Sequence, residues 1–188
     1  MGLDSKNDFQ HLLSCFGKDI QINTVHSKAI LKFEKVNENY DDITITTDQP
    51  LLQGDTIIYE ETRYIIVSQV SSERYGKYKG MARPCNFNIS IYTHVARVKI
   101  GVDGLGRPVY EDTPQYEEYP AIITSKVADW STGGQINLPQ GEVEVTIKDT
   151  QSANLNEGDT FTSMGKTWNI NYIDRSKVGL LVMRCKNS

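Results

Sequence analysis

The chain has 188 residues, of which 38% are hydrophobic, and this is enough to build a packed core in one large or two small domains. Its formal net charge is -4. The acidic balance argues against a protein that coats nucleic acids, because such proteins neutralise many phosphates with clustered Lys and Arg.

One amphipathic helix is expected at the start of the chain, over residues 5–16. Its apolar residues recur at i, i+3, i+4 and i+7, and they are Phe9, Leu12, Leu13 and Phe16. Gly17 follows as a C-terminal cap. Because so short a helix is marginal in water, its apolar stripe must pack against the chain or against an adjacent subunit.

A repeated pattern organises the rest of the chain. The first copy contains LLQGDTIIYEETRYIIV (51–67), and the second contains LNEGDTFTSMGKTWNI (155–170). Each has Leu, then Gly-Asp-Thr, a short strand-like run, a polar turn, and an aromatic residue that opens a second run. The pattern predicts two equivalent β-hairpins in which Tyr64 matches Trp168 and Thr56 matches Thr160.

Each copy also has a strand before the hairpin and a strand after it. Alternating apolar residues in 43–47 and 143–147 predict the leading strands, and apolar runs at 81–83 and 181–183 predict the closing ones. Both closing runs reach an Arg followed closely by a cysteine, Cys85 or Cys185. We take these endings as markers of the two copies.

Residues 88–127 alternate, turn at 103–106 and alternate again, so they are expected to form a long hairpin that joins the two copies. The predicted fold is all-β, with two similar small β-barrel or sandwich units in tandem and one short N-terminal helix. The predicted domains are residues 1–92, with the helix and the first unit, and residues 93–188, with the linking hairpin and the second unit.

No motif for catalysis or for ligand binding is convincing. The three cysteines and three histidines lack the spacing of a disulfide framework or a zinc site; they are Cys15, Cys85, Cys185, His11, His26 and His94. MGKTW sits in a hairpin turn rather than before a helix, GVDGLGRPV does not match the dinucleotide fingerprint, and no G-x-S-x-G elbow occurs. We therefore expect no enzymatic activity, no cofactor and no metal.

No membrane partner is expected either. No apolar run approaches the roughly 18 residues that a membrane helix needs. The N-terminus lacks the pattern of a signal peptide, and Lys6 stands where a myristoylation motif requires Ser or Thr. These features predict a protein that is made in a cytoplasm.

Two charged segments rich in tyrosine are the candidate interfaces, and both are expected to be loops. The basic one contains Arg74, Tyr75, Lys77, Tyr78 and Lys79, and the acidic one contains Glu111, Asp112, Glu117 and Glu118. Either both are solvated loops, or they meet between neighbouring subunits in a head-to-tail contact, which closes into a ring when the rotation allows. The acidic segment has a second possible use, which is to face a DNA channel and let the duplex slide.

The order of Gly-Asp, short strand, polar turn, aromatic strand and apolar strand ending in Arg and Cys resembles small structural proteins of tailed phages of Gram-positive hosts. The resemblance covers residues 43–86 and 143–187. It implies β-barrels of the head-tail connection or tail, assembled as a ring around the DNA channel, without catalysis. It also implies other neck, portal or tail proteins as partners, at most passive contact with DNA, and a location in the virion after assembly in the host cytoplasm. Stopper proteins of this type usually have one barrel, so the duplication departs from the pattern.

Two other functions are compatible with the residues. A tail or baseplate protein with carbohydrate- or ligand-binding loops would use tyrosines and Trp130 or Trp168 to stack on sugars. A single-strand nucleic-acid binder of the OB type would use Tyr75 and Tyr78 as stacking platforms. The acidic balance speaks against the second of these functions.

Overall fold

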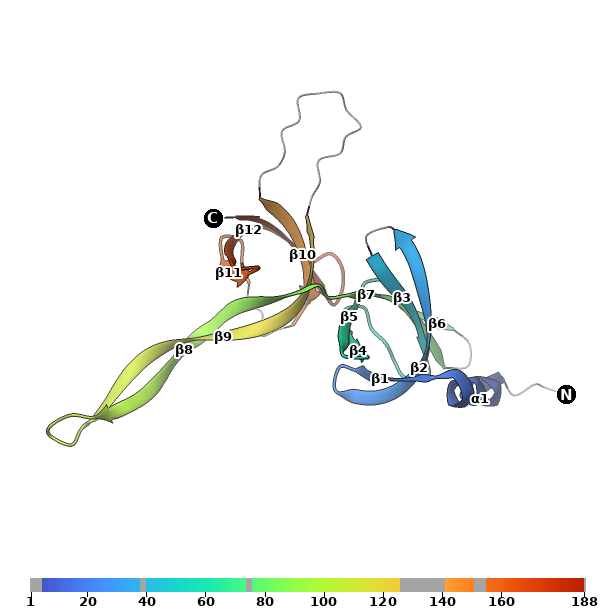
Figure 1. Ribbon diagram of the computed structural model, residues 1–188, viewed down its shortest axis with the longest axis horizontal. Helices are drawn as coiled ribbons and strands as arrows, with labels where there is room; N and C mark the ends of the chain where they lie inside the picture. The colour runs from blue at the N-terminus through green and yellow to red at the C-terminus, as the bar shows by residue number, and fades with distance from the viewer. Residues whose placement is uncertain (1–4, 38–39, 74–75, 126–140, 151–154, 188) are drawn as a thin grey trace, which may run out of the picture.

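The computed structural model describes residues 5–37, 40–73, 76–125, 141–150 and 155–187, and these residues form one helix and thirteen strands (Figure 1). The first part of the chain contains α1 (Ser5–Phe16), β1 (Lys18–Ile22), β2 (Val25–Asn37), β3 (Tyr40–Thr47), β4 (Thr56–Tyr59), β5 (Thr62–Ile66), β6 (Ser71–Glu73) and β7 (Lys77–Pro84). The second part contains β8 (Phe87–Val102), β9 (Pro108–Ser125), β10 (Glu142–Lys148), β11 (Thr160–Ser163), β12 (Lys166–Asp174) and β13 (Leu180–Asn187). The predicted all-β class and the predicted helix are confirmed.

Strands of the first part form a sheet that closes on itself, which we call the first barrel. The neighbours around it are β3, β2, β1, β4, β5 and β7, and β3 also pairs with β7 to complete the ring. The short strand β6 is added to β7. The described pairings of this sheet are antiparallel, as expected for strands joined by short turns.

Strands of the second part form a closed barrel in the order β10, β13, β12, β11, β8 and β9, which we call the second barrel. The two rings have the same topology when β1 is matched to β8, β2 to β9, β3 to β10, β4 to β11, β5 to β12, and β7 to β13. The prediction of two similar units in tandem is therefore confirmed. The chain repeats its Gly-Asp-Thr pattern because each barrel needs the same turn before the same hairpin.

The β-ladders confirm the predicted match of the two hairpins. Tyr64 pairs with Ile57, and Trp168 pairs with Phe161, so the two aromatic residues are equivalent. Both side chains are buried, and the indole N–H of Trp168 donates a hydrogen bond to the backbone oxygen of Ser163 at 3.1 Å. This burial removes Trp168 from the residues available for stacking on a sugar, and Trp130 lies outside the described residues.

The Gly-Asp-Thr turns also match bond by bond. The N–H of Gly54 donates to the oxygen of Ile66, and the N–H of Gly158 donates to the oxygen of Ile170, both at 2.8 Å. Asp55 and Asp159 each use one carboxylate oxygen to accept the backbone N–H three residues earlier, at 2.8 and 2.7 Å. The aspartates thus organise the turn, as Asp side chains commonly do.

The Arg and Cys endings, in contrast, are not equivalent. Ile66 pairs with Ala82, whereas the equivalent Ile170 pairs with Cys185. Cys185 therefore corresponds to Ala82, inside its barrel, while Cys85 lies beyond the end of β7. The markers suggested by the sequence were wrong because the ladder register, and not the identity of the residues, decides which positions are equivalent.

Each barrel has its own apolar core, built from strands that alternate between buried and outward-facing residues, as in β10. The first core consists of Ile20, Ile22, Ala29, Ile43, Ile45, Leu51, Ile57, Tyr64, Ile66 and Ala82. The second consists of Ile89, Ile91, Tyr119, Ala121, Ile123, Val143, Val145, Ile147, Leu155, Phe161, Trp168, Ile170, Leu181, Met183 and Cys185.

The long hairpin of residues 88–127 is not a linker between the two units, as the sequence suggested. Its strands β8 and β9 are the first two strands of the second barrel, equivalent to β1 and β2. The proposed boundary between residues 92 and 93 lies within β8, and the chain passes from one barrel to the other between Pro84 and Phe87. Alternation alone predicts a hairpin but does not reveal which sheet its strands join.

Candidate interaction surfaces

The two barrels meet at two glycines, Gly54 of the first and Gly179 of the second. Both have positive φ angles, 88° and 80°. A Cβ atom on Gly54 would collide with the carbonyl oxygen of Gly179, and one on Gly179 would collide with the carbonyl oxygen of Gln53. The two backbones therefore approach as closely as only glycine permits.

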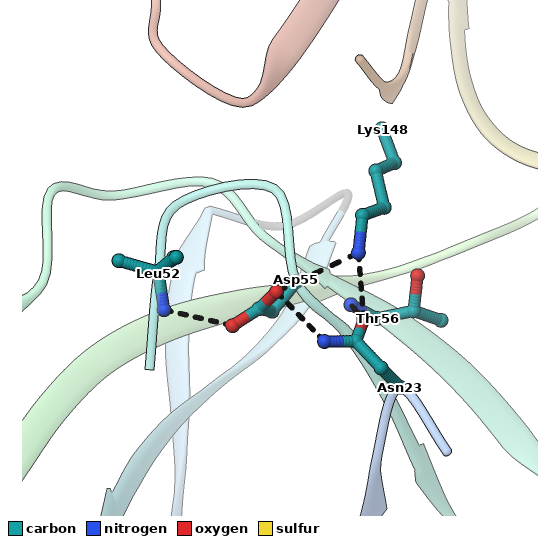
Figure 2. A network of polar contacts seen from close by, with 5 residues as sticks. All are labelled: Asn23, Leu52, Asp55, Thr56 and Lys148. Atoms are coloured by element: carbon teal, nitrogen blue, oxygen red, sulfur yellow. Dashed lines mark hydrogen bonds and ion pairs between the residues drawn. The ribbon is translucent and has the colours of Figure 1, made fainter. Parts of the chain in front are cut away.

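A polar network beside these glycines joins the barrels through Lys148 of β10 (Figure 2). Its ammonium group donates to Asn23 Oδ1 at 2.8 Å and lies 3.6 Å from Asp55 Oδ1. Asn23 also donates from Nδ2 to the same carboxylate oxygen at 2.9 Å, and its Oδ1 accepts the N–H of Thr56 at 3.1 Å. Asp55 is thus shared between the turn of its own barrel and a cation of the other.

A third, apolar contact completes what we call the junction. Ile65, Ile122 and Leu180 form a buried cluster, with Val67 and Cys85 packed against it. Ile65 and Cys85 lie in or next to the first barrel, and Ile122 and Leu180 belong to the second. Burial raises the pKa of the Cys85 thiol to about 12, although nearby Arg63 acts to lower it. Cys85 therefore serves as a small apolar residue here.

The face of the second barrel that is equivalent to the junction face of the first is not covered by any of the residues that the structure describes. Gly158, the counterpart of Gly54, has a φ of 94° and nothing within 4 Å of a Cβ built on it. A groove of about 700 Å³ lies beside it, lined by Ser90, Ile91, Tyr92, Thr93, Tyr116, Leu155, Asn156, Asp159, Thr160, Phe161, Thr162 and Thr167. We call this groove and the Gly158 turn the open face.

A long extension of the β8–β9 hairpin leaves the second barrel at the open face. Ile22 pairs with Ile57, and the equivalent Ile91 pairs with Phe161, so Tyr92 corresponds to Asn23. Where the first barrel makes its tight turn, the second carries an additional segment, residues 93–115, which we call the arm. Figure 1 shows the arm projecting away from both barrels.

The arm exposes apolar side chains that have no core of their own. They are Val95, Val98, Ile100, Val102, Leu105 and Val109, together with Tyr110. Bulges in the ladder interrupt its register at residue 93 and at residue 100. A two-stranded ribbon of this length, with apolar residues in water on both of its faces, favours a partner.

The tip of the arm is preorganised around Asp103. Asp103 Oδ1 accepts the N–H groups of Leu105 and Arg107 at 2.9 and 2.8 Å, and its backbone accepts the N–H of Gly106 at 2.9 Å. The turn predicted at 103–106 is therefore confirmed. Leu105 points outward with 78% of its surface exposed.

The acidic segment lies in strand β9, so the prediction of an acidic loop was wrong. Strand propensity of the alternating tyrosines and threonine outweighs the turn signal of its charges and proline. Glu111 and Asp112 lie on the arm, where Asp112 is directly opposite Arg97 in the ladder. Glu117 accepts a hydrogen bond from the hydroxyl of Tyr119 at 2.7 Å, and Glu118 is exposed at the base.

The basic segment lies at the other end of the molecule and is partly engaged within the chain. Lys77 places its ammonium group 4.8 Å from the ring centre of Phe9 in α1, and Tyr78 packs against the first core. Lys79 is exposed, and Arg74 and Tyr75 lie outside the described residues. The half-buried Tyr78 is therefore a poor platform for stacking a nucleic-acid base.

Helix α1 buries only part of its apolar stripe. Phe9 and Leu13 are buried against the first barrel, whereas Leu12 is 43% and Phe16 is 68% exposed. The helix ends where expected, with the N–H of Gly17 donating to the oxygen of Leu13 at 2.9 Å. The expectation of a packed stripe is confirmed for two of its four residues.

The sequence did not reveal the junction or the open face. Gly54, Gly179, Asn23 and Lys148 are separated by long stretches of chain, and no local pattern connects a glycine to its distant neighbour. The doubled Gly-Asp-Thr pattern was the available signal, but it predicts the turn and not the contact. Neither surface includes a group of three or more potential metal ligands within the described part of the chain.

Within the same described residues, the structure contains no helix long and apolar enough to cross a membrane.

Comparison with known proteins places this architecture in a family. The YomX N-terminal domain profile matches residues 3–83, which include α1 and the strands of the first barrel. The chain is also 25% identical over 131 residues to the SPbeta prophage-derived uncharacterized protein YomX of Bacillus subtilis (strain 168), covering 68% of this chain and 60% of that protein. No solved structure matches. The similarity supports a phage origin, and because the YomX C-terminal domain profile matches residues 52–186, the chain belongs to the YomX C-terminal domain family.

Proposed function

We propose that this chain is a non-enzymatic structural protein of a phage particle, located at the head-tail connection and assembled as a ring around the DNA channel. The observation that carries the proposal is the arm. An isolated two-stranded ribbon is marginally stable in water, and this one exposes Val98, Ile100, Val102 and Val109 along its length. Such a surface is stabilised when another protein covers it.

The shape of the molecule favours a head-to-tail arrangement. The arm and α1 lie at opposite ends of its long axis (Figure 1). Contacts between two different surfaces of identical subunits are heterologous, and they close into a ring when the rotation between subunits permits. The similarity to a prophage-derived protein supports the placement in a phage.

Localisation in purified particles tests this function. Mass spectrometry of purified virions should detect the chain, and gold-labelled antibody should mark the head-tail connection. A chain absent from intact particles, or found only at the tail tip, would contradict the proposed location. Omitting the protein from an assembly extract should yield heads and tails that fail to join.

A tail or baseplate protein that binds carbohydrate is the second candidate, and one observation favours it. Tyr92 and Tyr116 stand edge to face at the open face, with ring centres 6.0 Å apart, beside hydroxyl groups of Thr160, Thr162 and Thr167. Exposed aromatic rings next to polar groups suit the faces and hydroxyls of a sugar. Binding of cell-wall glycans that is lost in Tyr92→Ala, without particle defects at the neck, would favour this function.

A further inference from the structure

We propose that the open face of one copy binds the α1 end of a second copy, in a head-to-tail contact that uses the same barrel face as the junction within the chain but meets α1 instead of a bare barrel end. This inference rests on the proposed ring function and names the surfaces that would form the ring. The partner is identified from the internal repeat, because the chain already contains one example of the same barrel face bound to a neighbouring barrel.

The repeat defines which surfaces correspond. In the ladders, Ile43 pairs with Ala82, and Val143 pairs with Cys185, the counterpart of Ala82. Five residues further along, Asp48 therefore corresponds to Lys148. The end of the second barrel that presents Lys148 and Gly179 to the first barrel is thus equivalent to the end of the first barrel that contains Asp48.

Helix α1 covers that equivalent end of the first barrel. Gln10 donates from Nε2 to Asp48 Oδ2 at 3.0 Å, and Lys77 lies over Phe9. Lys77 follows Gly76, which the same register makes the counterpart of Gly179. The helix thus acts as a cap, as terminal elements of repeat proteins do. A direct copy of the junction between two chains would also place Asp159 against Asp48, two like charges, and the cap prevents this.

The opposite end of the tandem has no cap among the described residues. Gly158 and Asp159 are the counterparts of Gly54 and Asp55, which contact Gly179 and Lys148 at the junction. A Cβ built on Gly158, however, has nothing within 4 Å of it. Tyr92 and Tyr116 are 49% and 60% exposed beside it. The open face therefore retains the features of a barrel contact without a barrel in place.

The α1 end offers a matching surface. Leu12 and Phe16 expose apolar area on the outer side of the helix. Exposed Lys18 begins β1 just after the helix, and exposed Lys28 lies opposite Asp19 in the same ladder. These cations could form ion pairs with the carboxylates of Asp159 and Glu157 at the open face, as Lys148 does with Asp55 at the junction. Aromatic and apolar residues would supply most of the affinity, and the charges would set the register.

The arm fits this arrangement because it rises from the rim of the same face. Residues 94–102 extend about 30 Å at the usual rise of a strand, so the arm is long enough to lie along the docked subunit. Its exposed apolar side chains would then be covered by the neighbour, which removes the unfavourable exposure noted above.

Two variants, each altering one of the two proposed contact surfaces, test the contact in the full-length protein. The open-face variant is Tyr92→Asp with Tyr116→Asp, and the helix-end variant is Leu12→Asp with Phe16→Asp. The matched control is Phe33→Asp with Met164→Asp, which also introduces two aspartates at exposed apolar positions, outside both proposed surfaces. Circular dichroism and thermal melting establish that each variant is folded.

Light scattering after size exclusion, together with native mass spectrometry, should show self-association of the wild type and of the control. Each test variant alone should lose about tenfold or more in association affinity, as expected when central aromatic contacts are removed. A mixture of the two test variants should recover one intact contact per pair and form a heterodimer that goes no further.

Three results would overturn the inference. They are a wild type that remains monomeric at all concentrations, test variants that associate like the control, and a mixture that does not form heterodimers. Localisation in particles is independent of these outcomes, since the protein can be present in virions through other contacts. Conversely, formation of the heterodimer would support the proposed contact even if the protein were absent from the neck.

Discussion

At the tips of the two equivalent hairpins, the backbone takes the same left-handed path with different residues. Glu60 and Glu61 have φ angles of 46° and 67°, and Met164 and Gly165 have φ angles of 53° and 68°. Tight hairpins favour such turns because their twist matches that of the strands, and glycine adopts them with the least strain. The first barrel therefore carries a strained Glu61 where the second has glycine.

Replacing Glu61 by Gly should stabilise the protein. A left-handed backbone conformation costs a non-glycine residue roughly 1–2 kcal/mol, and glycine removes this cost. Glycine also increases the entropy of the unfolded chain, which offsets part of the gain, so the free energy of unfolding should rise by about 0.5–1 kcal/mol. Glu60 stays unchanged because it accepts a hydrogen bond from Tyr59 at 2.5 Å. Denaturant unfolding measures the change, and Gly165→Ala should shift stability in the opposite direction.

A buried ion pair ties β3 to β7 in the first barrel. Arg83 donates to both carboxylate oxygens of Asp42 at 2.9 Å, and the side chain of Asp42 is fully buried. Removal of one partner leaves an uncompensated charge, so Arg83→Ala should lower the free energy of unfolding by about 3–5 kcal/mol. The double variant Asp42→Val with Arg83→Met should be closer to the wild type. Equal losses in both proteins would show that the lost packing, and not the orphaned carboxylate, sets the cost.

At the scale of elements, the strands, the helix and the repeat were predictable because each leaves a local pattern. Period-two alternation predicted the strands, 3.6-residue spacing predicted α1, and Tyr64 and Trp168 predicted the match of the hairpins. The sequence did not predict that β8 and β9 belong to the second barrel, because closure of a barrel depends on pairing with strands far away in sequence. The Cys85 marker was misleading for the same reason. The exposure of Phe16 was not predictable because helical spacing identifies an apolar stripe but not how much of it the barrel covers.

The arm is an insertion into a turn, so it should be removable. Replacing residues 93–115 by Asn-Gly would join Tyr92 to Tyr116 with a two-residue hairpin turn of the kind that suits paired strands. Since the arm contributes no residue to either core, the melting temperature should change little, while self-association should weaken. A large loss of stability in the monomer would show that the arm supports its own barrel.

At the scale of the whole molecule, the junction makes the two barrels one unit. The close approach of Gly54 and Gly179, the Lys148 contacts with Asn23 and Asp55, and the Ile65 cluster all lie between barrels that otherwise have separate cores. A fixed angle between the barrels is what a ring requires, because small angular errors accumulate around a closed assembly. The α1 cap and the arm then give the two ends of this unit different surfaces.

Because the two barrels are equivalent, each glycine of the junction has a counterpart outside it, and alanine at that counterpart is the control for the backbone penalty. Gly54→Ala and Gly158→Ala both place a side chain at a positive φ angle, 88° and 94°, so both incur the same backbone penalty of roughly 1–2 kcal/mol. Only the first also collides with the other barrel. Gly179→Ala and Gly76→Ala form a second pair, with φ angles of 80° and 70° and open space around Gly76 alone.

In each pair, the junction variant should therefore lose about 1–3 kcal/mol more than its partner, the usual cost of overpacking. Calorimetry should also show a change in cooperativity. The wild type should unfold in one transition, and Gly54→Ala and Gly179→Ala should separate it into two as the barrels uncouple. Equal losses within each pair, or one transition in all four variants, would mean that the backbones move apart at little cost. The barrels would then be linked loosely, and a ring would have to obtain its fixed angle from contacts between subunits.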